Sequence, residues 1–193
     1  MTHEIVRKHY RQLWGDPSRV AEHIFKGQTS EKQAFEILKW DADRTAEGVA
    51  LYATIGASAY PLPGSPISHR FELFLGLRPP EDDVAMALAA AASFPFRTGK
   101  ALAPGHTVTL DDMPLWPGTE MQTFLVRHAR QPIVPTLLGP AGLHVEFWQA
   151  LPLHPTELEY HRRLGPDALL EQWEVCGVPF WDPRREAAVL PKR

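Results

Sequence analysis

Hydrophobic residues recur along the chain with two different periods, which separates predicted helices from predicted strands. Near the N-terminus the apolar and aromatic positions share one side of a helix that ends at Gly15 and Pro17. Those positions are Ile5, Val6, His9, Tyr10, Leu13 and Trp14. Strands are then predicted at residues 34–41, 48–56 and 71–78, where apolar side chains follow a period of two.

Proline divides the second half of the chain into short elements. All but one of the 19 prolines lie after residue 60, and proline fixes φ and removes a hydrogen-bond donor. The elements predicted there are a helix that begins at residues 79–83 and stops before Pro95, strands at 106–110, 120–127 and 143–153, and helices at 155–164 and 166–173. This order is not a regular βαβ alternation, so we predict an α+β fold.

Composition and charge narrow the class of protein. A chain of 193 residues with 44% hydrophobic residues is long enough to bury a core, and we expect one domain over residues 1–193. A net charge of −3 without a long basic run argues against nucleic-acid binding. The Ala-rich residues 84–96 are too short to span about 30 Å of hydrocarbon. The single Cys176 and the polar N-terminus favour a cytoplasmic protein.

One cluster of histidine and glutamate has the spacing of a possible metal site. His154, Glu157 and His161 are three and four residues apart, so on a helix they share one face. A catalytic zinc needs three nitrogen or oxygen ligands at about 2.0–2.2 Å. A metal-dependent hydrolase is therefore one alternative. The spacing is not that of the H-E-x-x-H helix, and the competing interpretation is a solvated helix face with an acidic first turn.

No other group of residues assembles a catalytic motif. No base can be assigned to Cys176 from spacing, and no serine lies in a G-x-S-x-G turn. The sequence has no glycine-rich phosphate-binding loop. The carboxylates of Asp82 and Asp83, and of Asp111 and Asp112, are adjacent and therefore diverge. We predict no enzymatic activity and no cofactor.

Aromatic residues indicate a binding surface. Trp148, His144 and Glu146 share the less apolar face of the strand predicted at 143–153, and Tyr60 and Trp116 lie in loops rich in proline and glycine. Tyrosine and tryptophan are preferred anchors at protein interfaces. We predict that these five residues contact a partner protein. The alternative is that helices cover the strand face and that the loop aromatics fold back onto the core.

Four segments, taken in order, resemble the Suppressor of fused domain. They are LYATIGAS, FELFLGL, PGHTVTLDDMPLW and GLHVEFWQALPLHPTELEYHRRLGPDALLEQW, and the resemblance covers residues 34–183. It implies a mixed, largely antiparallel sheet packed with helices in a sandwich, with no known catalytic activity. Animal members of this family bind and restrain Gli-type zinc-finger transcription factors, and they carry a further C-terminal domain.

The resemblance also limits what can be carried over to this chain. The acidic, glycine-rich loop of the animal proteins is replaced here by YPLPGSPIS, so no peptide-contact residue is transferred. Stand-alone bacterial members are thought to act as immunity proteins that neutralise toxins. The resemblance therefore implies a non-enzymatic, inhibitory or immunity-type partner of another protein. A structural homo-oligomer that pairs through an exposed sheet edge is a further alternative.

Overall fold

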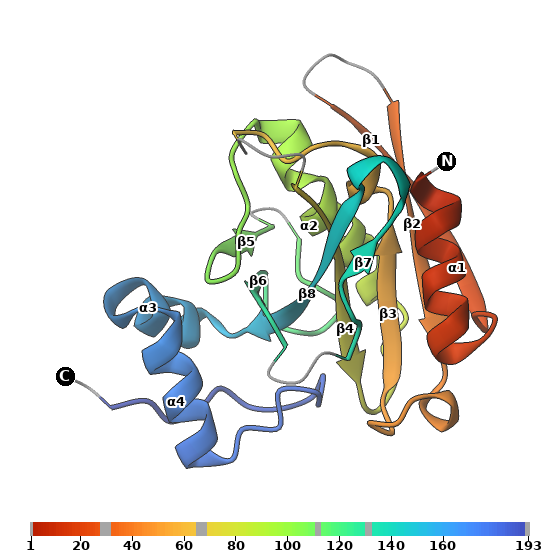
Figure 1. Ribbon diagram of the computed structural model, residues 1–193. Coiled ribbons are helices and arrows are strands. Elements are labelled where there is room, and N and C mark those ends of the chain that lie inside the picture. Colours follow the sequence, from red (N-terminus) through yellow and green to blue (C-terminus); the bar gives the residue numbers. More distant parts are fainter. Residues whose placement is uncertain (1, 28–31, 65–68, 111–112, 130–132, 192–193) are drawn as a thin grey trace.

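The computed structural model consists of four α-helices and one curled sheet of eight strands (Figure 1). It describes residues 2–27, 32–64, 69–110, 113–129 and 133–191. The helices are α1 (Thr2–Trp14), α2 (Val84–Thr98), α3 (Pro155–Leu164) and α4 (Pro166–Cys176). The strands are β1 (Arg19–Lys26), β2 (Lys32–Trp40), β3 (Ala50–Ile55), β4 (His69–Leu77), β5 (Thr107–Thr109), β6 (Thr123–Arg127), β7 (Leu137–Leu138) and β8 (His144–Leu153).

The sheet is mixed and largely antiparallel, with β8 as the strand that joins its two parts. The strand order is β1-β2-β3-β4-β8-β6-β5, and only the β4–β8 pair is parallel. The first part of β8 pairs with β4 and, at its other edge, with β7, whereas its last five residues pair with β6. Because β8 pairs with different strands along its length, the sheet bends at this strand.

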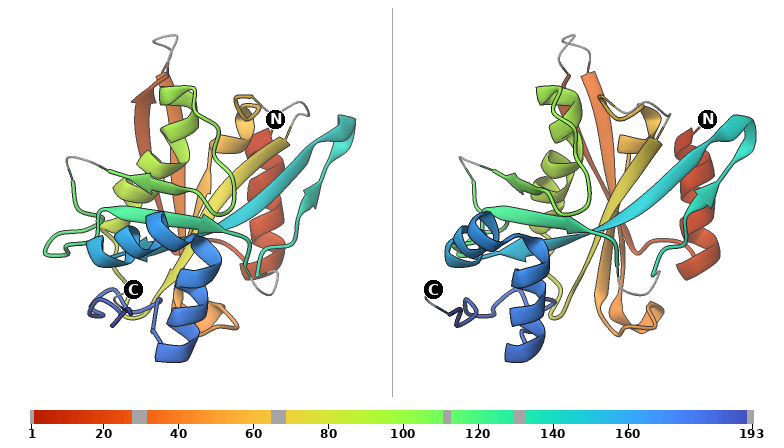
Figure 2. Two further views of the ribbon diagram at one scale, coloured as in Figure 1. Left: turned by 90° about the vertical axis from the view of Figure 1, so that its left-hand side faces the viewer. Right: turned by 60° about the vertical axis from the view of Figure 1, so that its left-hand side comes forward.

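Helices cover both faces of the sheet. α2 packs on one face, over β1 to β4, and α1 packs on the opposite face against β3 (Figure 2). Alternate residues of each strand therefore enter different cores, as the period of two predicts. In β2, Phe35 and Ile37 join the core under α2, whereas Leu38 and Trp40 join the core under α1.

A third core lies beside the α1 core, beyond the end of β8. Leu151 and Leu153 of β8 pack there against α3, α4 and residues 178–190. Leu169 and Trp173 of α4 are buried in it. The C-terminal segment is therefore part of the packed structure. The face that carries α1 also carries this third core.

The predicted α+β class is confirmed, and three element assignments need correction. The short strand β7 was not predicted. β1 was not predicted, because its apolar Val20 and Ile24 are exposed and alternate with charged residues. α2 does not stop before Pro95 but continues through it to Thr98. Proline removes one backbone donor, but the ring of Phe96 in that last turn packs against three other rings. Those rings are Phe35, Tyr60 and Phe71.

A carboxylate lies at the centre of the sheet, and its contacts among the described residues are hydrogen bonds from uncharged groups. Glu72 on β4 is fully buried. It accepts hydrogen bonds from the Thr54 hydroxyl, from the Gly56 and Ser58 backbone N–H groups and from the Ser58 hydroxyl. Burial raises the pKa of the Glu72 carboxyl, although these hydrogen bonds act in the opposite direction. The carboxylate therefore fixes the turn after β3 onto β4.

We expect the substitution Glu72→Gln to change how stability depends on pH. Because the folded protein holds the Glu72 proton more tightly than the unfolded chain does, this group makes the free energy of unfolding fall as pH rises. The fall extends from the ordinary carboxyl pKa to the raised one. Urea denaturation at a series of pH values should show this fall in the parent protein but not in Glu72→Gln. Parallel curves would show that Glu72 has an unshifted pKa, and Glu159→Gln, at an exposed site, serves as the control.

Candidate functional site

The three residues of the proposed metal site do not converge on a common point. The His154 ring nitrogen Nε2 lies 3.0 Å from the backbone oxygen of Arg185, and His161 Nε2 lies 3.0 Å from the backbone oxygen of Gly105. The Glu157 carboxylate is committed to Arg185. Within the described part of the chain, no group of three or more His, Cys, Asp or Glu side chains could hold a metal ion. The proposed ligand set is therefore a set of tertiary contacts.

Glu157 and Arg185 form a buried, two-pronged ion pair that holds the C-terminal segment. Arg185 Nη1 lies 2.6 Å from Glu157 Oε1 and Nη2 lies 2.7 Å from Oε2, and both side chains are at most 2% exposed. The carboxylate also accepts the backbone N–H groups of His154 and Ala188. Arg185 Nη2 donates further to the Pro152 carbonyl oxygen at the end of β8. Two elements, α3 and β8, are thereby joined to residues 185–188.

The held segment places two aromatic rings beside the sheet. Phe180 lies 5.1 Å from Trp181 in an edge-on arrangement and stacks on Trp173 of α4 at 6.4 Å. The Arg78 backbone N–H, just after β4, donates to the Trp181 carbonyl oxygen at 2.8 Å. The Trp181 side chain remains 41% exposed. A large aromatic surface is therefore fixed in place but not covered.

These rings form one wall of an apolar groove on the face of the sheet that carries α1. Two neighbouring cavities, of about 610 Å³ and 370 Å³, make up the groove. Both are lined by Gln149 of β8, by Phe180 and Trp181, and by Ile133 and Glu47. The larger cavity continues to α4 and the smaller one continues over β3 and β4. The groove thus lies between the core under α1 and the third core, to which α4 belongs.

Polar groups sit at defined points of this groove. Arg127 of β6 donates from Nε and Nη2 to the Gln149 side-chain oxygen at 3.1 and 3.0 Å. Its guanidinium group lies 5.6 Å from the centre of the Phe180 ring. The exposed residue Glu47 also lines both cavities of the groove. An apolar groove with a few oriented polar groups is suited to bind side chains of another molecule.

The predicted partner-contacting residues lie elsewhere. Trp148 is 4% exposed, stacks on Phe71 at 4.7 Å and donates from its indole N–H to Glu146, and Trp116 is 5% exposed. Both indoles belong to the core under α2, so neither presents surface on which a partner could bury area. This corrects the expectation that they are surface anchors. The covered-face alternative accounts for them.

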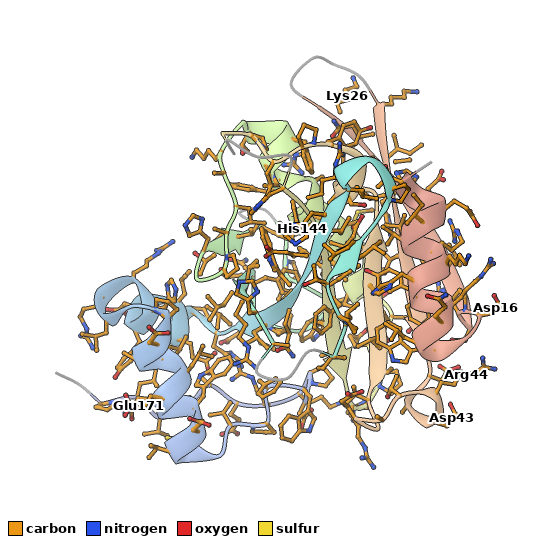
Figure 3. The ribbon with its side chains drawn as sticks, viewed as in Figure 1. Asp16, Lys26, Asp43, Arg44, His144 and Glu171 are labelled. Atoms are coloured by element: carbon orange, nitrogen blue, oxygen red, sulfur yellow. The ribbon has the colours of Figure 1, made fainter. Side chains whose placement is uncertain are left out.

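The other three predicted contacts are half-buried on the same α2 side. Tyr60 packs on Phe96 at 5.4 Å. His144, labelled in Figure 3, meets His69 edge-on at 5.3 Å across the parallel β4–β8 pair. Together with Glu146 they do not line the groove, and their role in binding stays a prediction. The sequence analysis does not predict the groove, because its lining residues come from distant segments and its exposed aromatic residue, Trp181, follows the last helix between two prolines.

Comparison with known families decides the relationship of this fold. The family model described as Suppressor of fused protein (SUFU) matches residues 31–186. The chain belongs to the Suppressor of fused family. Comparison with curated protein sequences gave no significant match.

Solved Suppressor of fused structures share the fold. A putative SUFU homolog from Neisseria gonorrhoeae FA 1090 aligns with a TM-score of 0.72 at 17% identity, covering 99% of this chain and 98% of its own. The Sufu chain of a Sufu–Fu complex aligns with a TM-score of 0.69 at 18% identity, covering 97% and 92%. Drosophila Suppressor of Fused aligns with a TM-score of 0.61 at 16% identity, and this chain spans 51% of its length. None of the described helices is long and apolar enough to cross a membrane.

We expect Arg185→Ala to destabilise the protein strongly. The substitution leaves the Glu157 carboxylate buried without its counter-ion, which typically costs about 3–5 kcal/mol. Chemical denaturation monitored by tryptophan fluorescence measures the loss. Arg184→Ala, at the exposed neighbouring position, is the matched control and should change the free energy of unfolding little. Equal effects of the two substitutions would contradict the role assigned to the ion pair.

Proposed function

We propose that this chain is a non-enzymatic protein-binding domain and that it binds its partner in the apolar groove beside Trp181. The observation that carries the proposal is the groove itself, in which exposed aromatic surface is held by a buried ion pair. Side chains that are already ordered lose little conformational entropy when a partner binds. Tryptophan and arginine, both present at this site, are residues that dominate binding energy at interfaces.

Family membership supports a protein as the partner. The Sufu chain to which this fold is similar was solved in a complex with another protein, Fu. The groove offers apolar surface and a small number of polar groups, and its described residues do not bring together a nucleophile with a base. We therefore favour recognition of a protein segment over chemistry on a small molecule.

A more specific proposal is that the partner is inhibited by the binding, as in an immunity protein that neutralises a toxin. The family resemblance supports this role, and a bacterial homolog of nearly the same length has the same fold. The proposal includes a cytoplasmic location and one domain over residues 1–193. Products of genes adjacent to that of this chain are the first partners to test.

We expect Trp181→Glu to weaken partner binding at least tenfold, because it places a charge in the apolar groove and removes the exposed indole. The measurement is isothermal titration calorimetry with the protein product of an adjacent gene. Val175→Glu is the matched control, because Val175 is 75% exposed on α4 and does not line the groove. Binding that is unaffected by Trp181→Glu would move the site away from the groove. Absence of binding by every neighbouring product would contradict the immunity role.

A further inference from the structure

β1 is an edge strand whose outer side has no strand partner among the described residues. It pairs with β2 over its whole length, from Arg19 opposite Lys39 to Lys26 opposite Lys32. The outer edge of such a strand presents unpaired N–H and C=O groups that can accept another strand. Val20 and Ile24 add exposed apolar surface on one face, at 49% and 58% exposure. The edge strand is therefore eight residues long and exposes apolar side chains.

Like charges face each other across the β1–β2 hairpin. Glu22 lies opposite Glu36, and Lys26 lies opposite Lys32. Arg7 of α1 binds both carboxylate oxygens of Glu36. Among the residues that the structure describes, none forms an ion pair with Glu22, Lys26 or Lys32. Directly opposite like charges destabilise a sheet. Within the described part of the chain, Lys26 therefore has no acidic partner and Glu22 has no basic partner.

A second copy of β1 carries the two missing charges in the required order. We propose that two copies of this chain pair through their β1 strands, antiparallel, about a two-fold axis through Ile24. This axis sets Ile24 opposite Ile24 and Glu22 opposite Lys26 of the second copy, and by symmetry it does so twice. Glu22, Ile24 and Lys26 share one face of the strand, so both ion pairs flank the Ile24 contact. Lys26 is the last residue of β1 and stands near the upper end of the hairpin in Figure 3.

Neighbouring two-fold axes do not give this match. An axis through Glu22 places the two Glu22 carboxylates against each other. An axis through His23 places Glu22 opposite Ile24 and Val20 opposite Lys26. An axis through Ala21 places Glu22 opposite Val20. Among these registers within β1, the one about Ile24 pairs opposite charges and also brings apolar side chains together. Electrostatic complementarity therefore favours this register over its neighbours.

Charge exchange tests this dimer in the full-length chain. Sedimentation velocity over a concentration series should show a monomer–dimer equilibrium for the parent protein. Glu22→Lys and Lys26→Glu should each raise the dissociation constant roughly tenfold or more, because each places like charges opposite each other at the two-fold axis. Neither should lower the melting temperature of the monomer, because each replaces a like-charge pair within its own hairpin by an opposite-charge pair.

Two combinations of these charge substitutions make the test specific. The double variant Glu22→Lys with Lys26→Glu should regain the parent dissociation constant. An equimolar mixture of the two single variants should form a heterodimer, since one strand is then basic and the other acidic. Glu159→Lys, at an exposed position on α3, is the charge-matched control and should not affect dimerisation. A parent protein that stays monomeric, single variants that stay dimeric, or combinations that do not restore pairing would each overturn the proposal. None of these results bears on binding in the groove.

Discussion

The buried ion pair between Glu157 and Arg185 is the contact on which the aromatic wall of the groove depends. A pair of charges removed from water is favourable only when both partners are present and their remaining hydrogen bonds are made. Here the carboxylate also accepts two backbone N–H groups, and the guanidinium group also reaches the end of β8. These contacts are directional, so they fix residues 178–190 at one position over the third core. They act together with the stacking of Phe180 on Trp173 and the Arg78–Trp181 backbone hydrogen bond to hold Phe180 and Trp181 beside the sheet.

The groove arises because β8 belongs to two packing units. Its first part lies between β4 and β7 over the α1 core, and its last part pairs with β6 under α3 and α4. The two cavities of the groove lie between these two packing units. Gln149, at the point where β8 changes partners, lines both cavities. In this member of the Suppressor of fused family, the same sheet curvature that closes the fold also opens the groove.

Local patterns predicted what depends on neighbours along the chain. The alternation in residues 34–41 correctly separated Phe35 and Ile37 from Leu38 and Trp40, because strand geometry alone sends them to opposite faces. The same reasoning failed where the decisive partner is distant in sequence. Helical spacing predicts that Glu157 shares a site with two histidines. In the structure its carboxylate forms an ion pair with Arg185, which follows the next helix. The prediction that Trp148 is exposed uses only the alternation within its own strand. The side chains that bury Trp148 are the ring of Phe71 on β4 and other core residues under α2, which are distant in sequence.

The parallel pairing of β4 with β8 has a consequence for how the chain folds during synthesis. Strands β1 to β4 form a continuous antiparallel meander and can pair as soon as they emerge from the ribosome. The edge of β4 that faces β8 stays unpaired until β8 is translated. The third core cannot be completed until Arg185 is translated. During that interval an unfinished sheet presents apolar strand edges to its surroundings. Completion of this fold therefore depends on residues as far along the chain as Arg185, and a nascent chain stalled before them would be left open to aggregation.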